Sequence, residues 1–185
     1  MFIVFEGIDG SGQSTHSKLL AEYLESKGYK VFLTKEPTQS EIGKLTRRIL
    51  KGEVEFDNLG LQLLMMADRA YHLKEIKRYL KEGYFVISDR FWFSTVVYGA
   101  ENEEKFEILY EFNSKLFGFP DVIIYLDLDP EISLKRIENR AKEIFENLEN
   151  LKKVRENYLK LIKKIENKCK VYIIDSSRSI EEVQK

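Results

Sequence analysis

Short apolar runs recur along the chain and alternate with longer segments that have the periodicity of helices. The runs are rich in β-branched and aromatic residues, which favour strands. They lack strict alternation of apolar and polar positions, as is typical of strands covered on both faces. The runs are "FIVFE" (2–6), "KVFLTK" (30–35), "YFVISD" (84–89), "DVIIYLDL" (121–128) and "KVYIID" (170–175). This pattern predicts an α/β fold with a central parallel sheet of about five strands and helices on both faces.

The segments between the runs predict helices, and some carry end signals. Ser14 can open a helix that Gly28 closes, and Asn58 can cap a long third helix. The stretch 131–168 is almost continuously helix-forming, interrupted at most at 141–147, and most of it is typical of a solvated helical hairpin. The predicted helices cover 14–27, 58 to about 80, 103–117 and 131–168.

Composition narrows the class of protein. With 185 residues, 43% of them hydrophobic, the chain can bury one sizeable core, and we predict one domain over 1–185. A formal net charge of −1 provides no overall field for nucleic acid or an anionic membrane, so we expect neither as a partner. Cys169 is the only cysteine, which excludes an intramolecular disulfide and a cysteine-based zinc cluster. No basic leader or membrane-length apolar run occurs, and we expect a soluble, cytoplasmic protein.

The stretch "FEGIDGSGQSTHSKLL" (5–20) has the outline of a phosphate-binding loop. Gly7, Gly10 and Gly12 follow a predicted strand and precede a predicted helix, where backbone N–H groups and the helix dipole favour an anion. Ser14 stands where the hydroxyl of such a loop ligates Mg²⁺. An ordinary glycine turn between a strand and a helix is the alternative.

Gln13 departs from the strict pattern G-x-x-x-x-G-K-[ST], which has lysine at this position. The glutamine amide offers neutral donors, whereas lysine brings a positive charge to the β- and γ-phosphates. Losing one electrostatic donor from an active site typically slows turnover roughly 100- to 1000-fold. We therefore expect reduced activity unless another cation enters the site.

Further motifs follow the loop in a characteristic order. They are "EP" (36–37), "IGKLTRRIL" (42–50), "DR" (68–69), "DRFWFSTVVYG" (89–99), "VRENYLKL" (154–161) and "IDSSRSIEEV" (174–183). Together with the loop, they resemble the thymidylate kinase family over nearly the whole chain. The resemblance implies a three-layer P-loop NTPase fold, phosphorylation of dTMP to dTDP with ATP and Mg²⁺, and a homodimer, for which the apolar helices within 58–117 offer an interface.

The resemblance also implies roles for individual residues. Asp9 would contact the acceptor sugar or metal-bound water, Arg69 would reach the thymine edge, and Tyr98 would crowd the 2′ position of the sugar. Arg90 would hold the acceptor phosphate; a structural pair with Asp89 is the alternative. The implied ATP-binding set is Gly7, Gly10, Ser11, Gly12, Gln13, Ser14, Thr15 and Arg178, and the implied metal ligands are Ser14 and Asp89. The implied dTMP-binding set is Asp9, Glu36, Pro37, Met65, Arg69, Arg90, Ser94, Thr95, Tyr98 and Tyr158.

Some positions depart from the family pattern. Met65 in "LLMMADR" stands where relatives commonly place phenylalanine to stack on thymine, and its polarisable sulfur can still cover a base. Thr95 stands where relatives often have Ser, Asn or Gly. Both residues can alternatively be core packing. Many relatives carry arginine near the "EP" turn, where Lys35 is the nearest cation along this sequence.

A short lid around 136–147 is the expected source of a second positive charge. Relatives carry an arginine in either the loop or the lid, and Ser11 in the loop makes this chain resemble the lid type. Arg136 and Arg140 lie four residues apart on one helical face, and Arg140 is the first choice. A solvated, salt-bridged helix is the alternative.

Three functions remain open from the sequence. The chain can be a dTMP kinase with catalytic residues Asp9, Gln13, Arg90, Arg136 and Arg140, a non-catalytic nucleotide-binding protein of the same fold, or a nucleoside monophosphate kinase with another acceptor. His16 and His72 have no visible acid partner and receive no chemical role.

Overall fold

A five-stranded parallel sheet forms the centre of the protein, as seen in a computed structural model that describes residues 1–138 and 143–185. The strand order is β2-β3-β1-β4-β5, and every neighbouring pair is parallel. The strands are β1 (Phe2–Gly7), β2 (Val31–Lys35), β3 (Phe85–Asp89), β4 (Val122–Asp127) and β5 (Lys170–Asp175). These are the five runs that the apolar pattern picks out, and the α/β prediction is confirmed.

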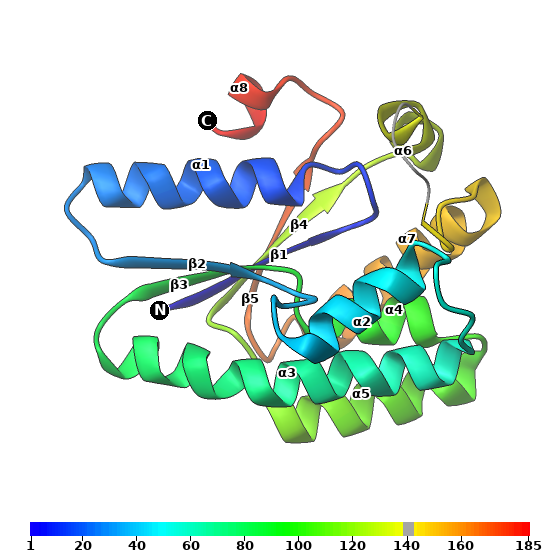
Figure 1. Cartoon of the computed structure of the whole chain (residues 1–185). Coiled ribbons are helices and arrows are strands. Elements are labelled where there is room, and N and C mark those ends of the chain that lie inside the picture. Colours follow the sequence, from blue (N-terminus) through cyan, green and yellow to red (C-terminus); the bar gives the residue numbers. More distant parts are fainter. Residues whose placement is uncertain (139–142) are drawn as a thin grey trace.

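Helices cover both faces of this sheet (Figure 1). In Figure 1, α1 and α8 lie on one face, whereas α3, α4 and α5 lie on the other. The helices of the described residues are α1 (Gln13–Ser26), α2 (Glu41–Leu50), α3 (Asn58–Lys81), α4 (Trp92–Gly99), α5 (Glu103–Phe117), α6 (Pro130–Ile137), α7 (Leu148–Ile165) and α8 (Ile180–Val183). The result is the three-layer fold of P-loop NTPases.

The central strand explains why its sequence lacks alternation. Phe2 and Val4 of β1 pack in a core cluster with α3, α4, α5 and α7. Ile3 and Phe5 point to the opposite face and pack in a second cluster that includes Ala21 of α1. Because both faces are covered, the successive side chains from Phe2 to Phe5 are all apolar.

The residues predicted to open the helices α1 and α3 need correction. Asp57, and not Asn58, caps α3, because the Asp57 side chain accepts a hydrogen bond from the backbone N–H of Gly60. Similarly, α1 begins at Gln13 with Gly12 as its N-cap, so Ser14 lies inside the first turn. Gly28 follows α1 with φ = 84°, as expected for a glycine that ends a helix.

The described residues of 131–168 contain two helices, in agreement with the interruption predicted at 141–147. The first, α6, ends at Ile137, and the second, α7, begins at Leu148. Asn147 caps α7 by accepting a hydrogen bond from the backbone N–H of Asn150. Among the described residues, no helix is long and apolar enough to cross a membrane.

The strand register assembles polar groups at one edge of the sheet. Asp89, at the end of β3, pairs with Phe5 of β1 and with Lys35 of β2. The chain leaves β1 at Gly7 and enters the glycine loop there. Ligands of open parallel sheets bind at this carboxyl edge, and the candidate site is built on it.

Candidate active site

The glycine loop between β1 and α1 depends on the absence of side chains at three positions. Gly10 and Gly12 have φ values of 78° and 96°, which residues with a Cβ rarely adopt. A Cβ on Gly7 would collide with Ser11 Oγ and lie 2.7 Å from the carbonyl oxygen of Leu126. The loop therefore leads directly into α1, whose first N–H groups are available to an anion.

Gln13 is held by the loop itself. Its Nε2 donates to the carbonyl oxygen of Gly7 over 2.6 Å, and the side chain is buried. This contact joins the two ends of the loop across six residues. It also engages one donor of the amide, and the side chain brings no positive charge to the cavity that it lines.

The two predicted metal ligands meet. Ser14 Oγ donates to the Oδ2 of Asp89, which lies at the end of β3. These are two oxygen ligands of the kind that Mg²⁺ prefers. The protein contributes one hydroxyl and one carboxylate at this position. Such a donor set fits Mg²⁺, which keeps several waters and binds substrate phosphates.

Asp9 in the loop joins two predicted site residues. Arg90 Nη2 donates to Asp9 Oδ1 over 2.7 Å, and Tyr98 Oη donates to Asp9 Oδ2 over 2.8 Å. Burial raises the pKa of Tyr98, and the Asp9 carboxylate raises it further, so the phenol stays a neutral donor. Arg90 has φ = 72°, and its Nη1 also donates to the carbonyl oxygen of Gly7 over 3.1 Å. Arg90 thereby pairs with Asp9, and not with its neighbour Asp89.

Glu6 is a buried acid near Arg90, and the sequence analysis assigned no role to Glu6. Its Oε1 accepts from the backbone N–H of Phe91, and its Oε2 accepts from both Ser94 Oγ and Tyr158 Oη at 2.7 Å. Burial raises the pKa of Glu6, while the nearby Arg90 opposes that rise. A single acid within the apolar run of β1 was the signal available in the sequence, because a buried carboxylate needs partners.

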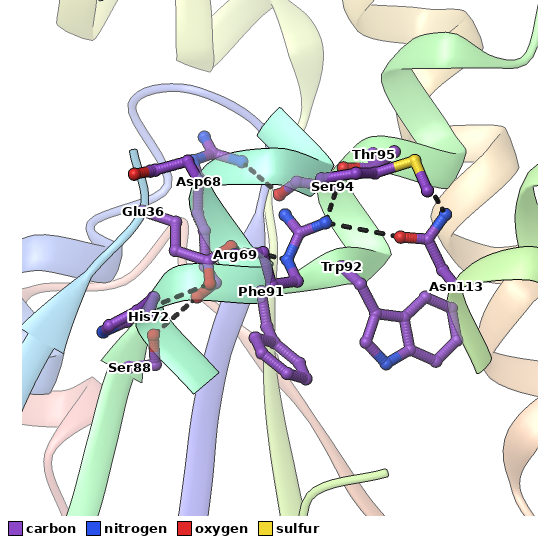
Figure 2. A network of polar contacts seen from close by, with 12 residues as sticks. Glu36, Asp68, Arg69, His72, Ser88, Phe91, Trp92, Ser94, Thr95 and Asn113 are labelled. Carbon is purple, nitrogen blue, oxygen red and sulfur yellow. Dashed lines mark hydrogen bonds and ion pairs between the residues drawn. The ribbon is translucent and has the colours of Figure 1, made fainter. Parts of the chain in front are cut away.

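A second buried acid, Glu36, organises the other side of the site (Figure 2). Its Oε2 accepts from Arg69 Nε over 2.7 Å, and its Oε1 lies 3.0 Å from His72 Nδ1. Arg69 Nη1 donates to Thr95 Oγ1 over 3.0 Å and to Asn113 Oδ1 over 3.3 Å. His72 thus does have an acid partner, contrary to the sequence analysis, which could not place Glu36 next to it.

Two further residues that the sequence analysis left without a role shape the turn after β2. Asp68 accepts hydrogen bonds from Thr38 N, Thr38 Oγ1 and Ser40 Oγ at 2.7, 2.5 and 2.6 Å. Arg47 of α2 donates to the carbonyl oxygens of Pro37 and Thr38 at 2.5 and 2.6 Å. The expectation that Lys35 is the cation of the "EP" turn is therefore incomplete, because the fold brings Arg47 to it as well.

One cavity of about 470 Å³ collects most of the predicted site residues. Those lining it are Asp9, Gly10, Gly12, Gln13, Ser14, Thr15, Glu36, Pro37, Met65, Arg69, Asp89, Arg90, Ser94, Tyr98 and Arg136. Thr95 and Tyr158 do not line it but hydrogen-bond to Arg69 and Glu6, respectively. Gly7 and Ser11 do not line the cavity. Arg178 does not line it either; it is exposed and donates to Asp175. Arg140 lies outside the described residues.

Comparison with known proteins agrees with this geometry. The family model described as thymidylate kinase matches residues 5–185. A probable thymidylate kinase of Thermococcus onnurineus is 42% identical over 99% of this chain and 93% of its own length. Those of Pyrococcus horikoshii and Methanococcus aeolicus are 44% and 43% identical, over 98% and 100% of this chain and 91% and 92% of their own lengths.

The chain belongs to the thymidylate kinase family. Within this member of the family, Arg136 of α6 contacts both the glycine loop and the loop that follows β5. Its Nη1 donates to the carbonyl oxygen of Gly10, and its Nη2 donates to that of Ser177, both over 3.4 Å. His16 lies beneath these loops, with its Nδ1 2.6 Å from Gln184 Nε2, and burial and Arg136 both lower its pKa.

Proposed function

We propose that this chain is an ATP-dependent dTMP kinase. A 5′-phosphate oxygen of dTMP attacks the γ-phosphorus of ATP, the bond from that phosphorus to the β,γ-bridging oxygen breaks, and dTDP and ADP leave. The family of the chain and the names of its relatives support this reaction.

One observation of the structure carries the proposal. A single cavity is lined both by the loop residues Gly10, Gly12, Gln13, Ser14 and Thr15, which offer backbone donors to phosphate, and by Arg69 and Met65 of α3, which suit a base. Phosphoryl transfer requires donor and acceptor to share one enclosed space, because positioning and electrostatics supply most of the catalysis.

The loop side of the cavity would hold ATP. Backbone N–H groups of the loop and of the first turn of α1 would bind its phosphates. Ser14 and Asp89 would hold Mg²⁺, which supplies charge neutralisation of the phosphates when it is bound. The contact between Ser14 Oγ and Asp89 keeps both oxygens at the carboxyl edge of the sheet.

The other side would hold dTMP. Arg69 would donate to the thymine edge, Met65 would cover the ring, and Arg90 would hold the phosphate. Tyr98 would exclude a 2′-hydroxyl by its bulk, since nothing there needs to pair with that hydroxyl. The contact of Tyr98 with Asp9 keeps the phenol ring against the loop, in support of this role.

The lid would compensate for the neutral Gln13. Arg136 lines the cavity and reaches the carbonyl oxygen of Gly10, next to the loop that would bind phosphate. Arg140, the first choice from the sequence, lies outside the described residues and stays a candidate for the same charge. An arginine delivered to a transferring phosphoryl group acts as the arginine finger does in related chemistry.

A second function is supported by one contact. Gln13 Nε2 donates to the carbonyl oxygen of Gly7, so the residue that replaces lysine is occupied within the loop. A protein with this arrangement can bind nucleotide without transferring phosphate. Met65 likewise keeps open a kinase with a different acceptor base.

A steady-state assay of ADP and dTDP formation from ATP, Mg²⁺ and dTMP tests these functions. We compare the chain with Gln13→Lys and with Arg136→Ala, and we run dUMP, dCMP and dGMP beside dTMP. Lysine at position 13 should raise kcat by roughly 100-fold or more, the typical value of one electrostatic donor. Turnover only in the lysine variant would support the binding protein, and equal use of all acceptors would reject the dTMP assignment.

We also propose a cytoplasmic homodimer. Leu59 and Leu63 of α3 and Ile108, Phe112 and Leu116 of α5 are apolar side chains that are more than half exposed. In Figure 1, these two helices lie side by side at the outer surface of the molecule. Burying such a face against a second copy removes apolar area from water, which favours association.

Sedimentation of the chain at micromolar concentration tests the homodimer. Phe112→Glu should shift the protein to monomer, because a charge would be buried at the interface. Tyr23→Glu replaces an equally exposed aromatic side chain on α1, on the opposite face of the sheet, and should leave the dimer intact. Sedimentation of the parent chain as a monomer would reject the dimer.

A further inference from the structure

His72 is a buried polar residue that the proposed reaction does not use. It lies in the middle of α3, is 3% exposed, and contacts two residues of the β2 strand and its end. Its Nδ1 is 3.0 Å from Glu36 Oε1, and its Nε2 is 2.8 Å from Thr34 Oγ1. A fully buried imidazole with both nitrogens engaged is held in one orientation.

The chemistry of the partners assigns the direction of these bonds. An ionised carboxylate only accepts hydrogen bonds, so His72 Nδ1 carries a proton and donates to Glu36. In the neutral imidazole, Nε2 is then the acceptor, and Thr34 Oγ1 donates to it. His72 thereby fixes the position of Oε1 of the Glu36 carboxylate.

The same carboxylate holds Arg69 with its other oxygen. Arg69 is 2% exposed, and its Nε donates to Glu36 Oε2 over 2.7 Å. Its Nη1 is shared between Thr95 and Asn113. The faces of Phe91 and Phe117 lie 5.6 and 5.4 Å from the guanidinium carbon. The planar guanidinium is consequently restrained on two of its three nitrogens and by the rings beside it.

The third nitrogen is different. Within residues 1–138 and 143–185, Arg69 Nη2 has no hydrogen-bond partner, and Arg69 lines the cavity. Figure 2 shows Arg69 with its dashed contacts to Glu36 on one side and to Thr95 and Asn113 on the other. A restrained group with one free nitrogen is suited to donate to an acceptor at a defined position.

We propose that His72 is a positioning residue for base selection, acting through the Glu36 carboxylate to orient the free donor of Arg69. The inference rests on the proposed function and adds the determinant of its acceptor specificity. Thymine presents an oxygen acceptor at C4, where cytosine presents an amino donor. A fixed Arg69 donates to the C4 oxygen of thymine but faces the amino group of cytosine, which is also a donor. A loosely held Arg69 can turn away from that mismatch and so discriminates less.

Two variants of His72 separate this role from packing. His72→Asn places an amide nitrogen near the position of Nδ1 and keeps the bond to Glu36, whereas His72→Gln reaches toward Thr34 and loses it. Both remove one of the two bonds of a buried side chain and should cost similar stability. Thr34→Val is the matched control, because it removes the Nε2 contact and leaves the imidazole and Glu36 in place.

The measurements are calorimetric binding of dTMP and dCMP, together with KM and kcat for both acceptors and KM for ATP. His72→Gln should weaken dTMP binding and reduce the preference for dTMP over dCMP by roughly tenfold, the equivalent of one hydrogen bond. The KM for ATP should not change, and kcat should stay within about twofold, because a merely positioned base site acts on ground-state binding. His72→Asn and Thr34→Val should keep the parental preference.

Equal preferences in His72→Gln and His72→Asn would overturn the inference, as would a loss of preference in Thr34→Val. If His72→Gln does not fold, His72→Ala replaces it and is measured with and without added imidazole. A preference for dTMP over dCMP that imidazole restores supports the role of His72. A His72→Ala variant that keeps the parental preference without imidazole overturns the inference. Failure of the proposed function has a separate signature. In that case the parent chain neither binds dTMP in preference to dCMP nor converts it, before any variant is made.

Discussion

The two sides of the cavity are built by different means. The loop side, which is proposed to hold ATP, is one contiguous segment, Gly7–Thr15, and its proposed ligands for phosphate are backbone groups and the start of α1. The base side, which is proposed to hold dTMP, is formed by buried side chains from the end of β2 and from three helices. These side chains are Glu36, Arg69, Thr95 and Asn113.

This difference determines how each side responds to substitution. A backbone donor remains when a side chain changes, so the loop can carry Gln13 and still keep its shape. A buried ion pair has no such tolerance, because removing one partner leaves an uncompensated charge away from water. We expect substitutions of the loop to change turnover and those of the base side to change both folding and binding.

The largest effect that would test this contrast is expected for Arg69→Ala. The variant leaves Glu36 buried without its cation, and breaking a buried pair typically costs about 3–5 kcal/mol of stability. Urea denaturation should reveal this loss, whereas Gln13→Ala should cost about 1 kcal/mol, the value of one hydrogen bond. Equal stability of the two variants would contradict the expected difference between the loop side and the base side.

A smaller effect is expected where the two sides meet. Tyr98→Phe removes the hydroxyl that donates to Asp9 of the loop and retains the ring. Kinetics should give a roughly fivefold lower kcat/KM for dTMP, equivalent to about 1 kcal/mol for one hydrogen bond. Selection against a ribose acceptor should persist, because the ring itself supplies the bulk. Loss of that selection in Tyr98→Phe would assign it to the hydroxyl.

The smallest effect is expected for the pH dependence of stability that comes from Glu6, which is buried and does not line the cavity. Burial raises the pKa of this carboxyl above its ordinary 4.5, although Arg90 opposes the rise. The folded state therefore holds the proton to a higher pH than the unfolded chain does. Its contribution to stability is fully present below pH 4.5 and is lost as the pH rises through the folded pKa.

Glu6→Gln should remove that dependence. The difference in unfolding free energy, variant minus parent, should increase as the pH is raised from below 4.5 to neutrality, and urea denaturation at several pH values measures it. Asp175→Asn is an exposed control, with a pKa lowered by its contacts with Ser177 and Arg178. A difference that does not vary with pH for Glu6→Gln would contradict the burial of a charged carboxylate.

The sequence predicted the parts that depend on neighbouring residues. The five strands follow from apolar runs, and the loop follows from glycine spacing, since both are local patterns. The predicted caps were wrong by one residue for α3, where Asp57 is the cap, and by two for α1, where Gly12 is the cap, because neighbouring residues offer similar capping signals.

The contacts that the sequence missed join residues far apart in the chain. Glu36 and His72 are 36 residues apart, and Arg69 and Asn113 are 44 apart. Glu6 and Tyr158 are separated by 152 residues. No periodicity or local motif predicts contacts between residues so far apart in the sequence. The sequence analysis therefore assigned no role to Asp68, Arg47 or Glu6.

The sequence by itself determined the α/β class, the glycine loop and membership of the thymidylate kinase family, because these are properties of short segments and of their order. The tertiary structure alone decided that Arg90 pairs with Asp9, that Arg47 reaches the turn after β2 and that His72 holds Glu36. The physical reason is the strand order, which interleaves β3 between β2 and β1 and so brings distant strand ends to one edge. There, buried polar side chains such as Glu36 and Glu6 are paired with residues that are distant in the sequence, which no local pattern identifies.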